Sequence, residues 1–287
     1  MVTTETPKPC LAAGRRMGSF IWAKRGGLLA MLAWALLATP ALNAQIGFVP
    51  SSAPGNPKAA APIDLTGYWV SVVTEDWRYR MMTPDKGDYP GIFLTPAAQR
   101  IAQSWDPAKD EAAGEQCKSY GAGAVMRVPT RLHITWDNDT TLHLETDAGK
   151  QVRLFHFGVS EPPKGEAPSW QGYSIASWEG LRPSRGSMGP VVATGGAPSA
   201  RHDEGYLKII TTDLRPGYVR KNGVPYGGNT VVEEYFDSFN EPNGDSWLVV
   251  TSLVTDPEYL AQPYLTSSQF KKQPDASGWN PTPCEAK

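Results

Sequence analysis

The sequence predicts an all-β domain, an antiparallel up-and-down barrel of about eight strands with one early helix. Three observations support this fold. Segments that alternate between apolar and polar residues recur from Arg131 to Val254, turn sequences such as "DND" and "EPNGD" separate them, and the helix pattern precedes them. Because closure into a barrel removes exposed strand edges, we prefer a barrel to the alternative, a two-sheet β-sandwich.

The expected elements follow one another along the chain. A strand pattern, "DLTGYWVSVV", begins at Asp64, and the helix begins at "TPAAQRIAQSW", where Thr95 suits the N-cap and Pro96 the first helical position. Glu233 and Glu234 are neighbours in a later strand, so one of them must face inward or find a basic partner. The later strand segments are "RLHITW", "TLHLETD", "QVRLFHF", "GYSIASWEG", "YLKIITTDL", "TVVEEYF" and "SWLVVTSLV".

Residues 1–44 have the pattern of a secretory signal peptide. Lys24 and Arg25 precede an apolar run of 13 residues, which small residues follow. A membrane span needs about 20 residues, so we expect no stable span in the mature chain. We expect an exported protein, periplasmic or secreted, with a flexible leader at 45–62 and one barrel domain at 63–287.

The charge of the mature chain argues against polyanionic partners. Removal of residues 1–44 takes away five of the 27 basic residues and one of the 29 acidic residues. The remaining 22 basic and 28 acidic residues give a net charge near −6. We therefore expect no nucleic-acid partner and no binding to an anionic membrane surface.

Two cysteines remain after Cys10 leaves with the signal peptide. An even pair in an oxidising compartment predicts a disulfide between Cys117 and Cys284. The alternative is a pair of free thiols. The bond would close a loop that includes most of the domain. The resulting loss of conformational entropy in the unfolded chain would stabilise the fold by roughly 5 kcal/mol at most.

One long segment interrupts the strand pattern between residues 181 and 205. It is rich in Gly, Pro and Ser and carries Arg182, Arg185 and Arg201. Loops of this length in a compact domain are lids, binding loops or disordered segments. The sequence leaves these alternatives open.

Gly67 and Trp69 in "TGYW" form a G-x-W pattern that resembles the one in the first strand of lipocalin barrels, near the closed end of the barrel. The run from "SIASWEG" through "LKIITTDLRPGYVRKNGVPY" to "VTDPEYLAQPY" is also similar to a large set of exported bacterial proteins without a settled activity. The resemblance spans most of residues 64–270 and implies a lipocalin-like (calycin-type) barrel, but it carries no catalytic residues across. The early helix departs from true lipocalins, as does the lack of an evident helix after the last strand.

Three central segments can be placed in register. If Trp136 pairs with Leu142, one face of the sheet is mainly apolar and the other mainly polar. This register places His156 beside Trp136 and Leu142 on the apolar face. A one-residue slip would reverse every assignment. On this register His156 faces the barrel interior, either as a hydrogen-bonded core residue or as a proton donor and acceptor in a ligand cavity. The apolar rows are then Ile134–Leu144–Leu154, Leu132–Thr146–Val152 and Trp136–Leu142–His156.

Two carboxylates are candidates to assist His156. If the first strand continues past Glu75, this residue lies near the barrel mouth among aromatic residues, where burial would suit it to act as a general acid. The alternative is a rim carboxylate paired with an arginine such as Arg78 or Arg127. Asp213 ends a strand in phase with inward residues, so we also expect it near an opening.

Aromatic residues make up 10% of the chain, and several fall on strand faces expected to line the barrel. An eight-stranded barrel is wide enough for one small ligand. We therefore expect a small hydrophobic or aromatic ligand. The candidate ligand-binding residues are Trp69, Trp77, Tyr79, Trp136, Trp178, Tyr218 and Tyr226.

The sequence favours neither a cofactor nor a metal. It contains no P-loop, no dinucleotide fingerprint and no G-x-S-x-G elbow. His133, His143 and Glu145 share one face of the central strands, but no HExxH or paired-cysteine spacing supports a metal site. We expect no cofactor and no metal.

Three functions remain open from the sequence. The first is an enzyme that acts on the small ligand by cofactor-free acid–base chemistry, as a lyase, isomerase or hydratase, with His156 as acid–base and Glu75 or Asp213 assisting. The second is a non-catalytic carrier or scavenger of the same ligands. The third is a module of the cell envelope that binds a partner protein.

Overall fold

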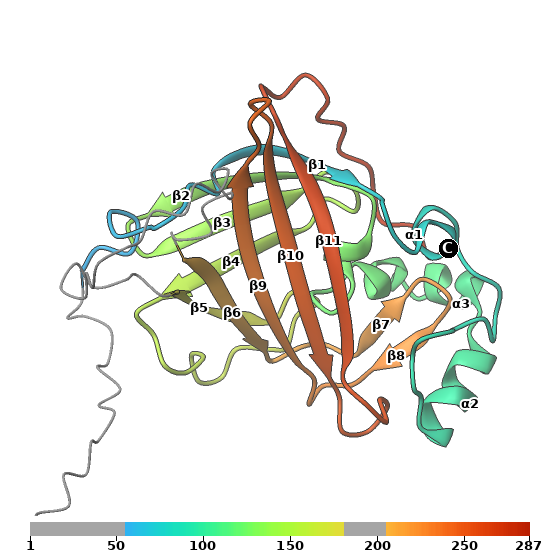
Figure 1. The fold of residues 1–287 in the computed structure, drawn as a ribbon. Helices are drawn as coiled ribbons and strands as arrows, with labels where there is room; N and C mark the ends of the chain where they lie inside the picture. Colours follow the sequence, from blue (N-terminus) through green and yellow to red (C-terminus); the bar gives the residue numbers. More distant parts are fainter. Residues whose placement is uncertain (1–54, 181–204) are drawn as a thin grey trace, which may run out of the picture. The chain divides into compact units, whose positions relative to one another are not determined.

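The computed structural model describes residues 55–180 and 205–287, and within them nine strands close into a barrel (Figure 1). The order around the barrel is β1-β11-β10-β9-β6-β5-β4-β3-β2. The predicted all-β barrel is confirmed, with nine strands in place of about eight. The strands are β1 (Gly67–Val72), β2 (Arg131–Asn138), β3 (Thr141–Thr146), β4 (Val152–Phe157), β5 (Tyr173–Glu179), β6 (Tyr206–Thr212), β9 (Val231–Asn240), β10 (Ser246–Thr255) and β11 (Tyr264–Gln273).

Three of the expected segments lie wholly or partly outside the described residues. The signal peptide expected at residues 1–44 lies outside the described residues, and so does the long loop expected at 181–205 except for Gly205. The leader expected at 45–62 is described from Gly55 onward. There the amide of Ala60 donates a hydrogen bond to the carbonyl of Asn56 at 2.9 Å.

The direction of the strands follows from their number. A closed barrel with an odd number of strands cannot alternate in direction all the way round, so at least one neighbouring pair must be parallel. Among the described strands this pair is β4 and β5, and the other neighbours run antiparallel. The connection over residues 158–172 returns the chain to the end at which β4 began, which departs from a pure up-and-down barrel.

The register between β3 and β4 differs from the predicted one by one residue. β2 and β3 pair as predicted, with Trp136 opposite Leu142, but on β4 it is Phe155, not His156, that lies opposite Leu142. The turn sets this register, because the amide of Thr146 donates to the carbonyl of Gln151 at 2.9 Å. Two residues inside this turn, Gly149 and Lys150, have positive φ.

The slip reverses the faces of β4. Arg153, Phe155 and Phe157 point inward and are buried, whereas Val152 and Leu154 are 45% and 38% exposed. The inward position predicted for His156 is therefore wrong. Burial of two phenylalanine rings and a paired arginine outweighs burial of the smaller set on the other face.

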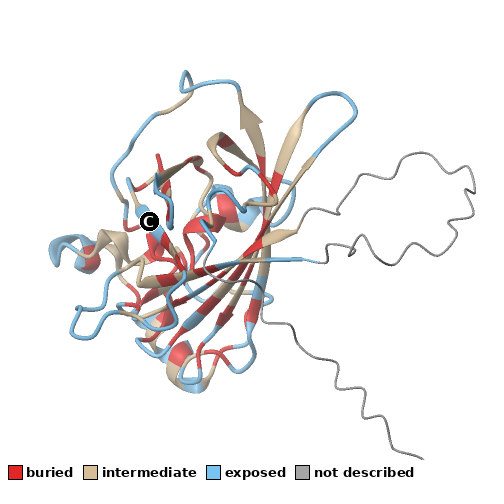
Figure 2. Ribbon diagram, turned by 90° about the vertical axis from the view of Figure 1, so that its left-hand side faces the viewer, coloured by how far each residue is buried: buried red, intermediate tan, exposed pale blue. Residues whose placement is uncertain are grey.

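The barrel interior is filled by side chains from alternate positions of every strand. Figure 2 shows buried residues along the strands and in the helices beside them. The largest side chains that are almost completely buried include Trp69, Arg153, Tyr226, Phe155, Phe236 and Phe270.

Short helices and a hairpin cover one end of the barrel, which we call the capped end (Figure 1). They pack on Val232, Val254 and Tyr264 in a second apolar cluster. The predicted helix is α2, where the side chain of Thr95 accepts from the amide of Ala98 at 3.3 Å. The elements of the cap are α1 (Trp77–Met81), α2 (Pro96–Ser104), α3 (Pro107–Ala112), the 3₁₀ helices η1 (Gln116–Tyr120) and η2 (Val125–Arg127), and the hairpin β7 (Gly217–Arg220) with β8 (Val224–Tyr226).

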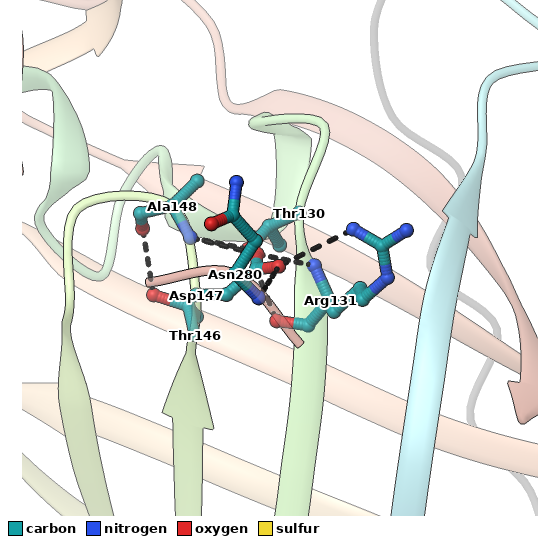
Figure 3. A network of polar contacts seen from close by, with 6 residues as sticks. All are labelled: Thr130, Arg131, Thr146, Asp147, Ala148 and Asn280. Atoms are coloured by element: carbon teal, nitrogen blue, oxygen red, sulfur yellow. Dashed lines mark hydrogen bonds and ion pairs between the residues drawn. The ribbon is translucent and has the colours of Figure 1, made fainter. Parts of the chain in front are cut away.

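The buried carboxylate of Asp147 holds the C-terminal segment against the barrel (Figure 3). One of its oxygens accepts from the amides of Arg131 and Ala148 at 2.7 Å each and from the Thr130 hydroxyl at 2.8 Å. The other accepts from the amide of Asn280 at 3.4 Å. These bonds fix the segment that carries the second cysteine.

Cys117 and Cys284 are paired at disulfide distance, with sulfur atoms 2.05 Å apart, as the sequence predicts. The pair joins η1 in the cap to the C-terminal segment across a sequence separation of 167 residues. Among the helices of the described residues, none has the length and apolar character needed to cross a membrane.

Candidate functional site

A cavity of about 670 Å³ opens at the end of the barrel where the chain enters β1. We call it the mouth pocket. Its wall combines residues from the entering segment 58–66, the start of β1 and β10, and the ends of β2, β9 and β11. The volume lies within the range of about 300–1,000 Å³ that is typical of small-molecule sites.

The floor of the mouth pocket is built around Trp69. This side chain is the first large inward residue of β1, is 1% exposed, and donates from Nε1 to the carbonyl of Leu65 at 2.9 Å. Lys272 lies opposite it in the β1–β11 register. The Lys272 ammonium sits 5.2 Å from the centre of a Trp69 ring and 4.0 Å from a carboxylate oxygen of Asp64.

A second indole, that of Trp136, forms another part of the wall. Its ring centre lies 5.4 Å from Phe157 and 6.5 Å from Trp178. The Trp178 Nε1 in turn donates to the carbonyl of Pro57 at 2.8 Å, which ties the entering segment to β5. These contacts hold the aromatic wall in one arrangement before any ligand binds.

The rim on the side of β9 and β10 is polar. Ser246 donates from its hydroxyl to the side-chain oxygen of Asn240 at 2.5 Å, and Ser238 also faces the pocket. Lys58 lines the opposite part of the rim. The site therefore combines an aromatic wall, two ammonium groups and a carboxylate, and none of its described lining residues is a histidine.

The candidate acid–base residue His156 lies elsewhere, on the outer face of β4. Its ring stacks on Tyr173 with centres 4.6 Å apart. Burial lowers the pKa of His156, and the charge of Glu166 opposes this shift. The structure thus separates His156 from the barrel interior and from the mouth pocket.

The first strand ends before the other candidates on it. Asp76 has a φ of 49°, a left-handed conformation that ends extended structure, and α1 begins at Trp77. Glu75 and Trp77 are therefore exposed at the capped end, and Tyr79 is half-buried there. The expectation that the first strand continues through these three residues is wrong, and none of them lines the mouth pocket.

Asp213 is also misplaced by the prediction. It is exposed, with a φ of 53°, at the turn after β6. It borders an outer groove of about 510 Å³ together with Glu166 and Tyr173, rather than the interior.

Tyr218 and Tyr226, two of the candidate ligand-binding residues, belong to the capped end. Tyr218 donates to Asp110 at 2.9 Å, and burial together with this hydrogen bond raises the pKa of Tyr218 to about 12. Tyr226 is 1% exposed, and burial raises its pKa well above the usual range. Its hydroxyl packs so closely on Gly121 and Gly217 that a Cβ at either position would collide with it.

A polar cluster lies inside the barrel, away from the mouth. Arg153 on β4 and Glu234 on β9 form a bidentate ion pair with distances of 3.0 and 2.5 Å, and both side chains are 0% exposed. Arg153 also donates to Thr211 at 3.3 Å, and the hydroxyl of Thr211 lies 2.8 Å from that of Ser174. Glu234 is the inward member of the glutamate pair noted in the sequence, as the alternation requires.

Two histidines of the outer face lie beside acidic residues, and Glu145 lies between them, with its second oxygen 3.9 Å from His143 Nε2. His133 Nδ1 lies 2.9 Å from Glu145, and His143 Nδ1 lies 2.8 Å from Asp137. His133 is also stacked on Tyr68 with ring centres 4.2 Å apart. Among the described residues, neither these side chains nor any other group of three or more His, Cys, Asp or Glu side chains is arranged to hold a metal ion.

Sequence reasoning names Trp69 and Trp136, which line the mouth pocket, as ligand-binding residues, but it expects Trp69 near a closed end of the barrel and misses Lys272. The segment "YLTSSQFKKQ", which forms β11, mixes polar and apolar residues at its inward positions, so it gives no strand signal. One feature of the sequence could have indicated Lys272. Lys271 and Lys272 are adjacent, and successive residues of a strand face opposite sides, so one of them must face inward if the segment forms a strand.

Comparison of the chain with protein-family models, with curated proteins and with solved structures gives no match. The class of protein is therefore defined by the fold and the site alone. The chain is a closed, mostly antiparallel β-barrel with a cavity at one end and a helical cap at the other.

Proposed function

We propose that this protein binds a small amphipathic molecule with an aromatic or apolar body and an anionic group, and that the mouth pocket holds it. One observation carries the proposal: the ammonium of Lys272 and the indole of Trp69 face the same cavity. Indole walls suit a flat apolar body, and an ammonium group suits a carboxylate, sulfate or phosphate.

The location of the acid–base candidates favours a carrier or scavenger over an enzyme. His156, Glu75 and Asp213 lie away from the mouth pocket, and none of its described lining residues is a histidine. Lyase or isomerase chemistry needs a proton donor or acceptor within hydrogen-bond reach of the ligand. The carboxylate of the pocket is a weak base: burial raises the pKa of Asp64, but hydrogen bonds from Thr66 and the charge of Lys272 lower it below its usual value. Binding without turnover needs only the wall and the charged groups.

We also propose that the barrel is of the lipocalin-like type and that the protein is exported. The closed barrel and the G-x-W tryptophan at the start of its first strand support the first point, although this tryptophan lies at the mouth and not at a closed end. The paired cysteines support the second, because such pairs persist in oxidising compartments.

The test uses the fluorescent probe 1-anilinonaphthalene-8-sulfonate, which has an aromatic body and an anionic group. We expect binding at one site with quenching of tryptophan emission, since Trp69 and Trp136 line the pocket. Lys272→Gln should weaken the affinity about tenfold or more, because a charge-assisted contact is lost. The neutral probe N-phenyl-1-naphthylamine should be bound almost equally by both proteins.

Lys271→Gln is the matched control. Lys271 is the neighbour of Lys272 on β11, points to the other face and contacts Asp245 at 2.7 Å. If Lys271→Gln weakens sulfonate binding as much as Lys272→Gln, the effect is one of net charge and the mouth pocket is not the site. Absence of probe binding to the wild-type chain would also contradict the proposal.

A further inference from the structure

Three arginines are buried together at the capped end. Arg80 on α1, Arg127 on η2 and Arg220 on β7 are 6%, 8% and 6% exposed. Arginine is rarely buried to this degree unless its charge is paired. The three side chains come from separate segments of the chain, so the fold itself gathers them.

Arg127 and Arg220 contact Tyr264, the first residue of β11, and Arg80 joins them through the backbone of Arg127. Arg220 Nη2 lies 3.4 Å from the Tyr264 hydroxyl, and the Arg127 guanidinium lies 5.8 Å from the centre of the Tyr264 ring. Arg80 Nε donates to the carbonyl of Arg127 at 3.0 Å. The Arg220 guanidinium also covers the ring of Tyr79, at 4.9 Å from its centre.

The negative charge around this cluster is incomplete. Arg127 donates to Asp76 at 3.0 Å, whereas the hydrogen bonds found for the other two arginines end on neutral oxygens. These acceptors are the hydroxyls of Ser71 and Tyr264 and the carbonyls of Pro90 and Arg127. The charges of Glu75 and Asp76, both exposed, also act on Arg80, but neither carboxylate forms a hydrogen bond with it.

Two donors of the cluster remain unpaired. Arg80 Nη1 and Arg220 Nε are buried and have no hydrogen-bond partner among the described residues. Burial and then the charge of Arg127 lower the pKa of Arg80, as expected where positive charges are crowded. A buried guanidinium without a counter-ion is costly, and an anion is the partner that relieves that cost.

We propose that Arg80, Arg127 and Arg220 form a binding site for a small oxyanion, separate from the mouth pocket. The planar forks of guanidinium groups match the oxygens of phosphate and carboxylate groups. Asp76, whose side chain is 50% exposed, occupies the solvent side of the cluster on Arg127. An incoming anion competes with this carboxylate for Arg127.

The competition with Asp76 distinguishes an anion site from a cluster that only stabilises the fold, because only an anion site should bind phosphate more tightly when Asp76 loses its charge. Asp76→Asn removes the competing charge and should tighten the binding of inorganic phosphate severalfold. Arg220→Gln should weaken it about tenfold or more. The readout is titration calorimetry of the full chain at low ionic strength, with thermal unfolding in parallel. Above the dissociation constant, each tenfold rise in phosphate should raise the wild-type Tm by roughly 3–6 °C.

Two further variants serve as controls. Arg78→Gln removes an exposed arginine from α1, next to the cluster, and should leave phosphate binding unchanged. Lys272→Gln at the mouth should also leave it unchanged, which separates this site from the proposed ligand pocket. If either variant weakens phosphate binding as much as Arg220→Gln, the cluster is not the site.

A measurement on the wild-type chain keeps the test independent of how the variants fold. The Nε–H resonances of Arg80 and Arg220 should shift in ¹⁵N-detected spectra on addition of phosphate, or of acetate if the site prefers carboxylates. Saturable shifts with either anion support the proposal. If neither anion shifts these resonances, or if Asp76→Asn weakens binding, the proposal is overturned.

Discussion

His156 lies on the outer face of β4 in surroundings that partly bury it, and this burial favours its neutral form. Its ring stacks on Tyr173, and the negative charge of Glu166 acts in the opposite sense. Burial dominates, so the pKa of His156 in the folded chain lies below its ordinary value of about 6.5. This residue therefore contributes to the pH dependence of folding.

The sign of that contribution follows from proton linkage. Between about pH 6.5 and the lower folded pKa, the unfolded chain binds the proton of His156 more tightly than the folded chain. The contribution of His156 to stability is thus fully present above about pH 6.5 and is lost as the pH falls through the folded pKa. We expect the ring resonances of His156 to titrate with a midpoint below 6.5 in NMR spectra.

A variant isolates this effect from the carboxylates that titrate in the same range. In urea denaturation between pH 7.5 and 5, His156→Gln should lose less stability than the wild type. A midpoint for His156 above 6.5, or equal losses in both proteins, would contradict the assignment.

The ion pair between Arg153 and Glu234 connects two strands that are not neighbours in the barrel. β4 and β9 are separated by β5 and β6, and the hydroxyls of Ser174 and Thr211 on those strands complete the network. Both charged side chains are fully buried, so each depends on the other for compensation.

We expect Arg153→Met to lower the free energy of unfolding by about 3–5 kcal/mol, because Glu234 is left as an uncompensated buried charge. The double variant Arg153→Met/Glu234→Leu should be distinctly more stable than the single one, since no buried charge remains. Urea denaturation at pH 7 measures both.

The matched control is the outer pair of Lys208 and Glu233, one position away on β9, with a separation of 2.8 Å. These side chains are partly exposed, so Lys208→Met should cost only about 0–1 kcal/mol. If Lys208→Met is as damaging as Arg153→Met, burial does not explain the effect.

At the level of strands, alternation predicts most elements but not every register. The β2–β3 register follows from the sequence because one face is clearly apolar. β4 offers apolar residues on both faces, Val152 with Leu154 on one and Phe155 with Phe157 on the other, so its pattern is satisfied either way. The choice depends on Glu234, which lies 81 residues further along the chain than Arg153.

The same reasoning explains the errors in the candidate site. The alternation of aromatic residues after β1 imitates a strand, but the left-handed backbone at Asp76 ends it and turns the chain into α1. Lys272 is not predicted because β11 has polar residues at inward positions, so its sequence lacks the alternation of a strand, and the segment is extended only as part of the closed barrel. Local sequence patterns therefore fail to predict the positions of residues whose contacts lie far away along the chain.

For the molecule as a whole, the cysteine pair connects the cap to the C-terminal segment. Cys117 belongs to η1, and Cys284 follows the segment that Asp147 holds against the barrel. A cross-link over 167 residues removes a large part of the conformational freedom of the unfolded chain.

We expect Cys117→Ser/Cys284→Ser to lower the free energy of unfolding by about 3–5 kcal/mol. Urea denaturation of the wild type with a reductant should give a similar loss, and the reductant should not affect the double variant. A wild type whose unfolding midpoint is the same with and without reductant would contradict a bonded pair.

The parallel pair of β4 and β5 makes the barrel wall uneven in strength. The two strands share three paired positions, Phe155–Ser174, His156–Ile175 and Phe157–Ala176, and parallel pairing is the weaker kind per residue. β9 and β10, in contrast, pair along their whole length. The wall therefore has a seam, and local opening should begin there, with the earliest amide exchange in the strands. Arg153 on β4 and Glu234 on β9 lie on either side of this seam, so their ion pair opposes the separation of β4 from β5.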